Sequence, residues 1–168
     1  MINRFDLVVT RHGARFMGRH FAYSIGRGGI CAPEDKREGD GATPAGVHQL
    51  VGLFYHPARL PRPCAGALPT SPALRWSDDS RDPDYNHLVR LPHRFSHERL
   101  QRPDPLYDLV IVTDWNWPLA EAGRGSAIFV HTWRRPRYPT AGCVAFARPD
   151  LLWIAGNLRP ETRLVVKA

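Results

Sequence analysis

The sequence predicts a mainly β domain, and two observations support this fold class. The chain has 14 glycines and 16 prolines among its 168 residues, and they are spread along its whole length. The apolar runs between them are short. Frequent turn residues between short apolar runs are typical of strands joined by turns, not of a helical bundle. We therefore expect a β domain with long loops and one helix.

The first third of the chain contains three predicted strand segments. Residues 6–10 read as a first strand, and residues 11–13 as a turn. Residues 19–25 alternate apolar and polar side chains, which is the period of a half-buried hairpin or meander. A polar loop with several glycines, residues 26–41, leads to another strand within residues 47–55.

The rest of the chain contains the two segments that we expect at the centre of the sheet. Residues 56–105 are rich in proline, arginine and aspartate and have little periodicity, so we predict long loops over the sheet. Residues 106–113 and 127–131 are strongly apolar, and both are predicted central strands. Residues 164–166 complete the sheet as a last strand.

The single predicted helix covers residues 148–158. Pro149 suits a first helical turn, and the carboxylate of Asp150 is favourable at the same end because of the helix dipole. Leu151, Leu152, Ile154 and Ala155 supply an apolar surface, and Gly156 can end the helix.

Size and charge indicate one basic domain, residues 1–168, which we expect to be a monomer. A chain of this length buries enough surface for its own core. The formal charge is +7, and 21 of the 23 basic residues are arginine. This excess fits either a solvated basic surface or affinity for a polyanion or for carboxylate-bearing substrates. No apolar run reaches the roughly 20 residues of a membrane span, and no export signal is visible.

The cysteine count is odd, so at least one thiol lies outside any intramolecular disulfide. Cys31 and Cys64 either form a bridge or remain buried free thiols, and both alternatives stay open. No metal and no cofactor is expected. His93 and His97 lack a third ligand, and the aspartates of residues 78–84 lack the glycine and glutamate of a calcium loop.

Cys143 and His131 form the pair with the clearest chemical meaning. A cysteine attacks a carbonyl as thiolate, and a nearby imidazole at the end of a strand is a suitable base. Gly142 lets the backbone approach a substrate closely, and backbone amides beside the thiol can stabilise an oxyanion. The segment is therefore a candidate cysteine acyl-transfer site.

Three segments resemble the L,D-transpeptidase catalytic domain, the YkuD-like family. His131 follows an apolar strand, and the sequence Thr-Ala-Gly-Cys at residues 140–143 is similar to the family motif Ser/Thr-His-Gly-Cys. Thr-Pro-Ala-Gly at residues 43–46 resembles the family's Thr-Pro-x-Gly turn. Two positions depart from the pattern, because Ala141 replaces the second histidine and Ala145 stands where many members have arginine.

The resemblance implies a β-sandwich of the YkuD type and a cysteine acyltransferase that cross-links bacterial peptidoglycan. Cys143 would form a thioester with a donor stem peptide, and His131 would take the thiol proton. The carbonyl of Thr132 would orient the imidazole, and the amides of Gly142 and Cys143 would hold the oxyanion. An amine of an acceptor stem would then give a 3-3 or a 1-3 cross-link.

The resemblance also suggests how the substrate is held and where the enzyme works. Arg134 and Tyr138, between the histidine and the cysteine, are candidate contacts for a stem peptide, and Trp115 and Trp133 are candidate cleft walls. The implied location is the periplasm or the cell-wall face, and carbapenems would acylate the thiol. Two other functions remain open: a hydrolase, for example a carboxypeptidase, with the same site, and a non-catalytic basic module for RNA or anionic wall polymer.

Overall fold

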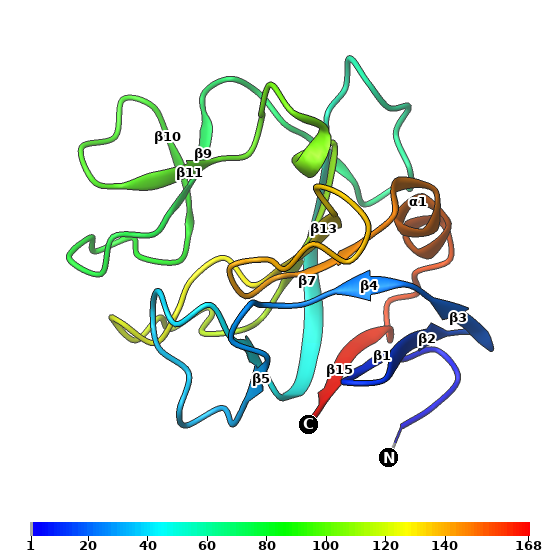
Figure 1. The fold of residues 1–168 in the computed structure, drawn as a ribbon. Coiled ribbons are helices and arrows are strands. Elements are labelled where there is room, and N and C mark those ends of the chain that lie inside the picture. Colours follow the sequence, from blue (N-terminus) through cyan, green and yellow to red (C-terminus); the bar gives the residue numbers. More distant parts are fainter. Residues whose placement is uncertain (1) are drawn as a thin grey trace.

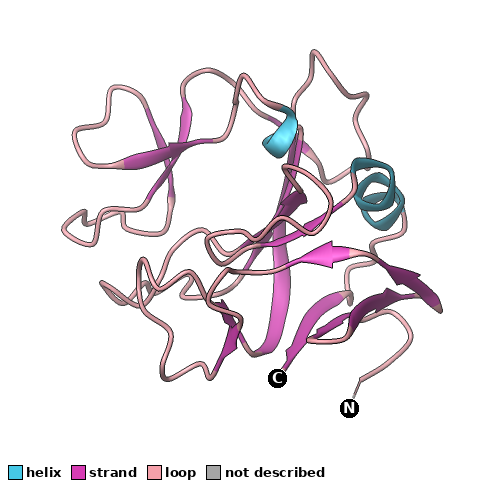
Figure 2. Cartoon of the chain, viewed as in Figure 1, coloured by secondary structure: helices cyan, strands magenta, loops and turns pink. Residues whose placement is uncertain are grey.

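The computed structural model describes residues 2–168 as a curled β-sheet with a smaller second sheet and one α-helix beside it (Figures 1 and 2). The predicted mainly β class is confirmed. The elements, in chain order, are β1 (Leu7–Thr10), β2 (Gly13–Phe16), β3 (Arg19–Phe21), β4 (Tyr23–Ser24), β5 (Ile30–Cys31), β6 (Thr43–Pro44), β7 (Gly46–Tyr55), β8 (Leu68–Pro69), β9 (Leu74–Ser77), β10 (Leu88–Arg90), β11 (His97–Arg99), the 3-10 helix η1 (Pro105–Tyr107), β12 (Leu109–Thr113), β13 (Phe129–Thr132), β14 (Val144–Phe146), α1 (Arg148–Gly156) and β15 (Arg163–Lys167).

The main sheet curls until its two ends are neighbours in the chain. Its strand order is β3-β2-β1-β15-β7-β12-β13-β14-β4, with β8 paired to β7. The end strands β3 and β4 are separated only by Ala22, so the sheet forms a near-barrel. Most neighbours are antiparallel, but three pairs are parallel: β1 with β15, β7 with β8 and β13 with β14. The pairing of β13 with β14 places Val130 beside Val144, which fixes the two ends of the loop that joins these strands.

Strand β12 separates two apolar clusters. Leu109 and Ile111 pack into the larger cluster, which also includes the buried face of α1. Val110 and Val112 point to the opposite side and pack into a smaller cluster under the second sheet. Both faces of this strand are buried, which explains its continuous apolar sequence.

The second sheet corrects our prediction for residues 56–105. This segment contains β8 and the three-stranded sheet β10-β9-β11 instead of loops alone. The antiparallel strands pair Trp76 with Leu88 on one side and with Glu98 on the other. Each is only three or four residues long and includes an arginine, so no alternation was long enough to indicate a strand. Figure 1 shows this sheet as a separate lobe beside the main sheet.

Several boundaries also differ from the prediction. The helix ends at Gly156, two residues earlier than expected. The first part of the predicted strand over residues 106–113 is the 3-10 helix, which Asp104 caps through a hydrogen bond from the Leu106 amide. All three cysteines are free thiols. None of the helices within residues 2–168 has the length and apolar character needed to cross a membrane.

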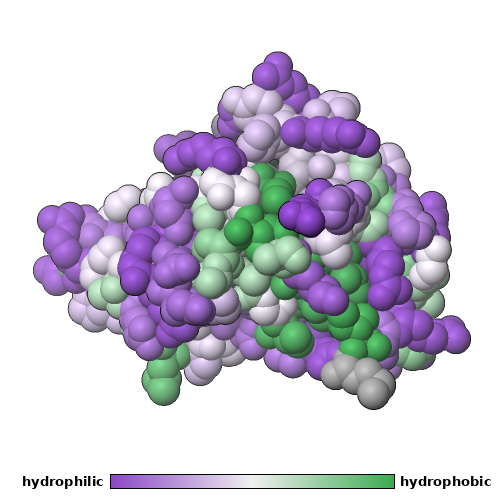
Figure 3. All heavy atoms as spheres, turned by 60° about the horizontal axis from the view of Figure 1, so that its bottom comes forward, coloured by the Kyte–Doolittle hydropathy of each residue, from purple (hydrophilic) through white to green (hydrophobic). Residues whose placement is uncertain are grey.

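The surface is mostly hydrophilic. Figure 3, a view onto the side of the termini, shows a narrow apolar strip between broad hydrophilic areas. The exposed large apolar side chains come from several elements, such as Val47 on β7 and Leu88 on β10. Scattered apolar residues of this kind are normal on a protein surface.

Candidate active site

Cys143 lies at the start of β14, next to the strand that carries His131. The parallel register pairs His131 with Ala145, so the cysteine precedes the paired segment by one residue. Its side chain belongs to the smaller apolar cluster and is only 9% exposed. The sequence places it there because β14 is apolar on every residue and is buried along its whole length.

A buried threonine holds the loop that precedes the thiol. The Thr43 hydroxyl donates to the carbonyl of Gly142 at 2.7 Å and accepts from the amide of Gly26 at 2.9 Å. Gly142 has a φ of +143°, and a Cβ there would lie 3.0 Å from the carbonyl oxygen of Ala42. A side chain at this position would be strained and crowded. The Thr-Pro-Ala-Gly turn therefore fixes the backbone beside the cysteine.

The amide of Gly142 is engaged within the same loop. It donates to the Thr140 hydroxyl at 3.1 Å, and that hydroxyl donates to the carbonyl of Cys143 at 2.6 Å. The predicted oxyanion role of the Gly142 amide therefore requires a rearrangement of this hydrogen bond. The Thr140 hydroxyl would have to release the Gly142 amide before that amide could donate to an oxyanion.

The thiol of Cys143 has two backbone partners. It donates to the carbonyl of Ala127 at 3.0 Å and accepts from the amide of Phe129 at 3.4 Å. Ala127 has a φ of +51°, in the left-handed region, and its own amide donates to the buried side chain of Asn86 at 3.0 Å. Asn86 thus holds the strained residue whose carbonyl accepts the hydrogen bond from the thiol.

His131 is fixed on two sides. Its Nδ1 lies 2.8 Å from the carbonyl oxygen of Thr132, which leaves Nε2 as the nitrogen available for proton transfer. The ring of Tyr107 packs edge-on against the imidazole, with ring centroids 5.1 Å apart. Burial lowers the pKa of His131 to about 4. The imidazole is therefore neutral at pH 7.

The thiol is also neutral at pH 7. Burial raises the pKa of Cys143 to about 12, and the carboxylate of Glu98 acts in the same direction. Within residues 2–168, no hydrogen bond joins Sγ of Cys143 to the imidazole of His131. The free site therefore holds a neutral thiol near a neutral base, and catalytic hydrogen bonds of this kind often form only when a substrate binds.

Polar residues of β11 and η1 form the wall behind His131. The Tyr107 hydroxyl donates to Glu98 at 2.9 Å, and Arg102 lies over the ring of Tyr107. Arg102 also pairs with Asp104 through two hydrogen bonds of 2.9 and 2.8 Å. Burial raises the pKa of Glu98. This network fixes the orientation of Tyr107 and, through it, of His131.

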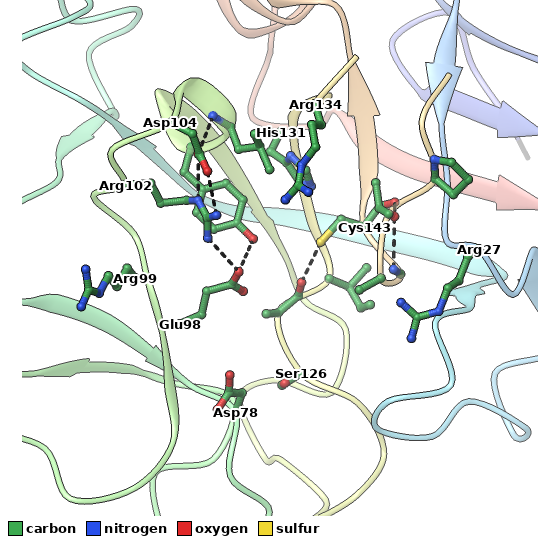
Figure 4. A pocket seen from close by; sticks show the side chains of 18 of the residues that line it. Arg27, Asp78, Glu98, Arg99, Arg102, Asp104, Ser126, His131, Arg134 and Cys143 are labelled. Carbon is green, nitrogen blue, oxygen red and sulfur yellow. Dashed lines mark hydrogen bonds and ion pairs between the residues drawn. The ribbon is translucent and has the colours of Figure 1, made fainter. Parts of the chain in front are cut away.

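These side chains line one cavity of about 1170 Å³. Figure 4 shows Cys143 and His131 at its centre, Glu98 and Arg102 on one side and Arg27 on the other. Arg134, Tyr138 and Gly142 line it as well. The Thr132 carbonyl acts on the site through the imidazole.

Two predicted substrate contacts lie elsewhere. Neither Trp115 nor Trp133 is among the residues that line the cavity. Trp115 is buried, packs against His48 and donates from its indole to the carbonyl of Arg124. Trp133 is partly buried, and its amide donates to the carbonyl of Phe146.

Comparison with protein families identifies the domain. A model of the L,D-transpeptidase catalytic domain, YkuD, matches residues 3–166, nearly the whole chain. The chain belongs to this family. Comparisons with curated proteins and with solved structures give no match. L,D-transpeptidases of the YkuD type depend on a cysteine and act on peptidoglycan peptides outside the cytoplasm.

Three residues that the sequence did not single out support the candidate L,D-transpeptidase site. Glu98, Tyr107 and Asn86 support the site from outside the motif segments. They lie in the region predicted as loops or beside it, and no motif marks them. Among residues 2–168, no cluster of three metal-ligating side chains is present.

Proposed function

We propose that this chain is a peptidoglycan L,D-transpeptidase in which Cys143 is the nucleophile and His131 the general base. One observation carries the proposal: in a chain of this family, the cysteine and the histidine lie together in a large cavity that also holds charged side chains. A cavity of this size has room for a peptide.

The first step is acylation. Sγ of Cys143 forms a bond to an amide carbonyl carbon of the donor stem while Nε2 of His131 takes the thiol proton. The C–N bond then breaks, and the same proton goes to the leaving amine, which leaves a thioester. The thiol pKa of about 12 far exceeds the imidazole pKa of about 4, so a separate proton transfer before attack is unfavourable. Proton transfer and attack therefore occur together.

The second step is transfer to the acceptor. An amine of a second stem attacks the thioester carbonyl, a new C–N bond forms and the C–S bond breaks. His131 takes the amine proton and returns it to the departing sulfur. The product is a 3-3 cross-link, or a 1-3 cross-link if the first stem residue is the donor. Attack by water in place of the amine would make the protein a carboxypeptidase-like hydrolase.

Arg134 and Tyr138 are the predicted residues best placed to contact a stem peptide, because both line the cavity. Trp115 and Trp133 would act only indirectly, since neither lines the cavity. We propose that the reaction takes place at the periplasmic or cell-wall face, where stem peptides are found, and needs no cofactor.

Defined disaccharide-peptides test the proposal. The protein is incubated with disaccharide-tetrapeptide, and the products are sequenced by tandem mass spectrometry. We expect cross-linked dimers, with the bond position distinguishing 3-3 from 1-3, and none with Cys143→Ala. Hydrolysed monomers as the main product would establish the hydrolase instead.

Intact-protein mass spectrometry after carbapenem treatment provides a second test. A single adduct is expected, and it should be absent in Cys143→Ala. An adduct that persists in this variant would contradict the assignment of the nucleophile. Affinity for RNA that is steeply salt-dependent and indifferent to Cys143, without any acylation, would favour the basic binding module.

A further inference from the structure

A second pocket lies beside the catalytic cavity and differs from it in charge. Its volume is about 380 Å³, within the usual range for ligand pockets. The turn between β1 and β2, residues 21–27 and 29, Arg137 and Pro139 form its walls. Arg27 and Pro139 line both pockets, so the two are contiguous.

Three arginines line this pocket, and no acidic residue does. Arg11, Arg27 and Arg137 are all exposed, and none forms an ion pair with a carboxylate within residues 2–168. The catalytic cavity is different, because its Arg102 is paired with Asp104. The Nε of Arg11 donates to Nε2 of His12 at 3.0 Å. Guanidinium groups without a carboxylate partner around one hollow attract an anion, and their planar donor geometry suits a carboxylate.

A buried hydroxyl in the same pocket lacks a partner. Ser24 lines the pocket and is only 4% exposed, and its Oγ makes no hydrogen bond within residues 2–168. Buried polar atoms are nearly always hydrogen-bonded, so an unpartnered one marks a place where a ligand or a water completes the bonding. The hydroxyl can donate to a carboxylate oxygen.

The pocket lies on the Arg27 side of the nucleophile. Figure 4 shows Arg27 and Glu98 on opposite sides of Cys143. Pro139 lines both pockets, and the next residue, Thr140, is held against Gly26 by a parallel bridge. A peptide that lies across this bridge brings its amine to the thioester while its carboxylate reaches the arginines.

We propose that this arginine pocket (Arg11, Arg27, Arg137 and Ser24) binds a carboxylate of the acceptor stem peptide, while the donor stem occupies the side of Glu98 and Arg102. The proposal rests on the proposed transpeptidase function. It assigns the substrate's acidic end to a site outside the motif segments. It also gives three of the chain's dispersed arginines a shared role in binding the substrate.

The test separates acceptor binding from acylation. The Arg11→Gln/Arg137→Gln double variant removes two of the charges and leaves Arg27, which also lines the catalytic cavity. Arg15→Gln is the matched control, because Arg15 is an exposed arginine of β2 that lines neither pocket. Protein acylated at Cys143 by a carbapenem is titrated with disaccharide-tetrapeptide, so that the peptide reports only on the acceptor side.

We expect the Kd of the peptide to rise about tenfold or more in the double variant, as loss of charge-assisted hydrogen bonds predicts. The acylation rate should stay within about twofold of the unmodified chain, by the same scale of energies. Arg15→Gln should match the unmodified chain, and Arg137→Lys should recover part of the affinity. A peptide with amidated carboxylates should bind the unmodified chain and the double variant equally.

Three results would overturn the proposal: an unchanged Kd in the double variant, an equal fall in acylation, or binding of inorganic phosphate as tight as that of the peptide. Failure of the proposed function looks different, because then neither carbapenem adduct nor cross-linked product forms. In that case the same titration on Cys143→Ala still tests the pocket. Thermal unfolding of each variant checks that it is folded.

Discussion

At the scale of single residues, burial sets the protonation states of the candidate nucleophile and of its candidate base. The thiol of Cys143 and the imidazole of His131 are both almost fully buried, and burial disfavours the charged form of each. A preformed thiolate–imidazolium pair, as in many cysteine enzymes, is therefore unfavourable here. A neutral, buried thiol is less open to oxidation and alkylation than an exposed thiolate.

This protonation state predicts the pH profile of alkylation. With a pKa of about 12, the labelling rate of Cys143 by iodoacetamide should keep rising through pH 10, because the thiolate fraction is still increasing. Peptide-level mass spectrometry separates Cys143 from Cys31 and Cys64. The pKa is inferred from the shape of the rate–pH curve and not from the absolute rate, because burial slows labelling at every pH. A thiol with the ordinary pKa of about 8.5 levels off by about pH 10, so a profile that levels off there or earlier would contradict the prediction.

The sequence was sufficient to propose Cys143 and His131 as a pair, and the structure brings both into one cavity. A glycine before the thiol and an apolar strand before the histidine are features of neighbouring residues. Asn86 and Tyr107 were missed, since their roles depend on contacts with Ala127 and His131 from distant parts of the chain. No spacing in the sequence reports such contacts.

At the scale of elements, the Thr43 turn connects three segments. β6 supplies Thr43, whose hydroxyl joins the loop after β4 to the loop before β14 through Gly26 and Gly142. The threonine is fully buried, so neither backbone group has water as an alternative partner. The turn therefore holds the backbone of the loop that precedes Cys143.

Thr43→Val tests this role, because valine keeps the shape and removes the hydroxyl. Two buried backbone groups lose their partner, at a cost of about 1–3 kcal/mol in the free energy of unfolding for each unpaired group. We expect acylation of Cys143 to slow as well. Thr43→Ser keeps the hydroxyl and should lose only about 1 kcal/mol for the missing methyl group. Denaturant unfolding and carbapenem acylation measure both effects. Equal behaviour of the two variants would refute the hydrogen-bonding role.

The elements that the sequence predicted share one property, which is a long apolar or alternating run. The strands within residues 47–55 and 127–131 and the helix at residues 148–156 have it. The strands β9, β10 and β11 do not, because their few residues include arginines that pair across the sheet or face solvent. They form because Leu74 and Trp76 pack on the smaller cluster, and that contact is a tertiary effect.

At the scale of the whole molecule, the first and last strands hold the two ends of the chain together. β1 and β15 run parallel, with Leu7 opposite Leu164, in the middle of the main sheet. Just before β1, Asp6 is buried, and its carboxylate accepts two hydrogen bonds from Arg163 of β15, at 2.9 and 2.8 Å. The hydrogen bond from Arg163 holds the pKa of Asp6 below its usual value.

Arg163→Gln should destabilise the fold by about 2–4 kcal/mol at pH 7, because it leaves a buried carboxylate without its charged partner. The lowered pKa means that this stability is present above the ordinary aspartate value of about 3.9 and is lost as pH falls through the folded value. The gap between the unmodified chain and the variant should therefore be widest near neutrality and narrow at acid pH. Chemical denaturation at several pH values measures it.

Two control variants test whether the loss of stability in Arg163→Gln comes from the unpaired carboxylate of Asp6. Arg15→Gln removes an exposed arginine of similar size and should change the free energy of unfolding by less than about 0.5 kcal/mol. The Asp6→Asn/Arg163→Gln variant removes both charges and should be more stable than Arg163→Gln alone, since no unpaired carboxylate remains buried. If the single and double variants are equally unstable at pH 7, the two chain ends are joined by packing of β1 on β15, and the ion pair contributes little.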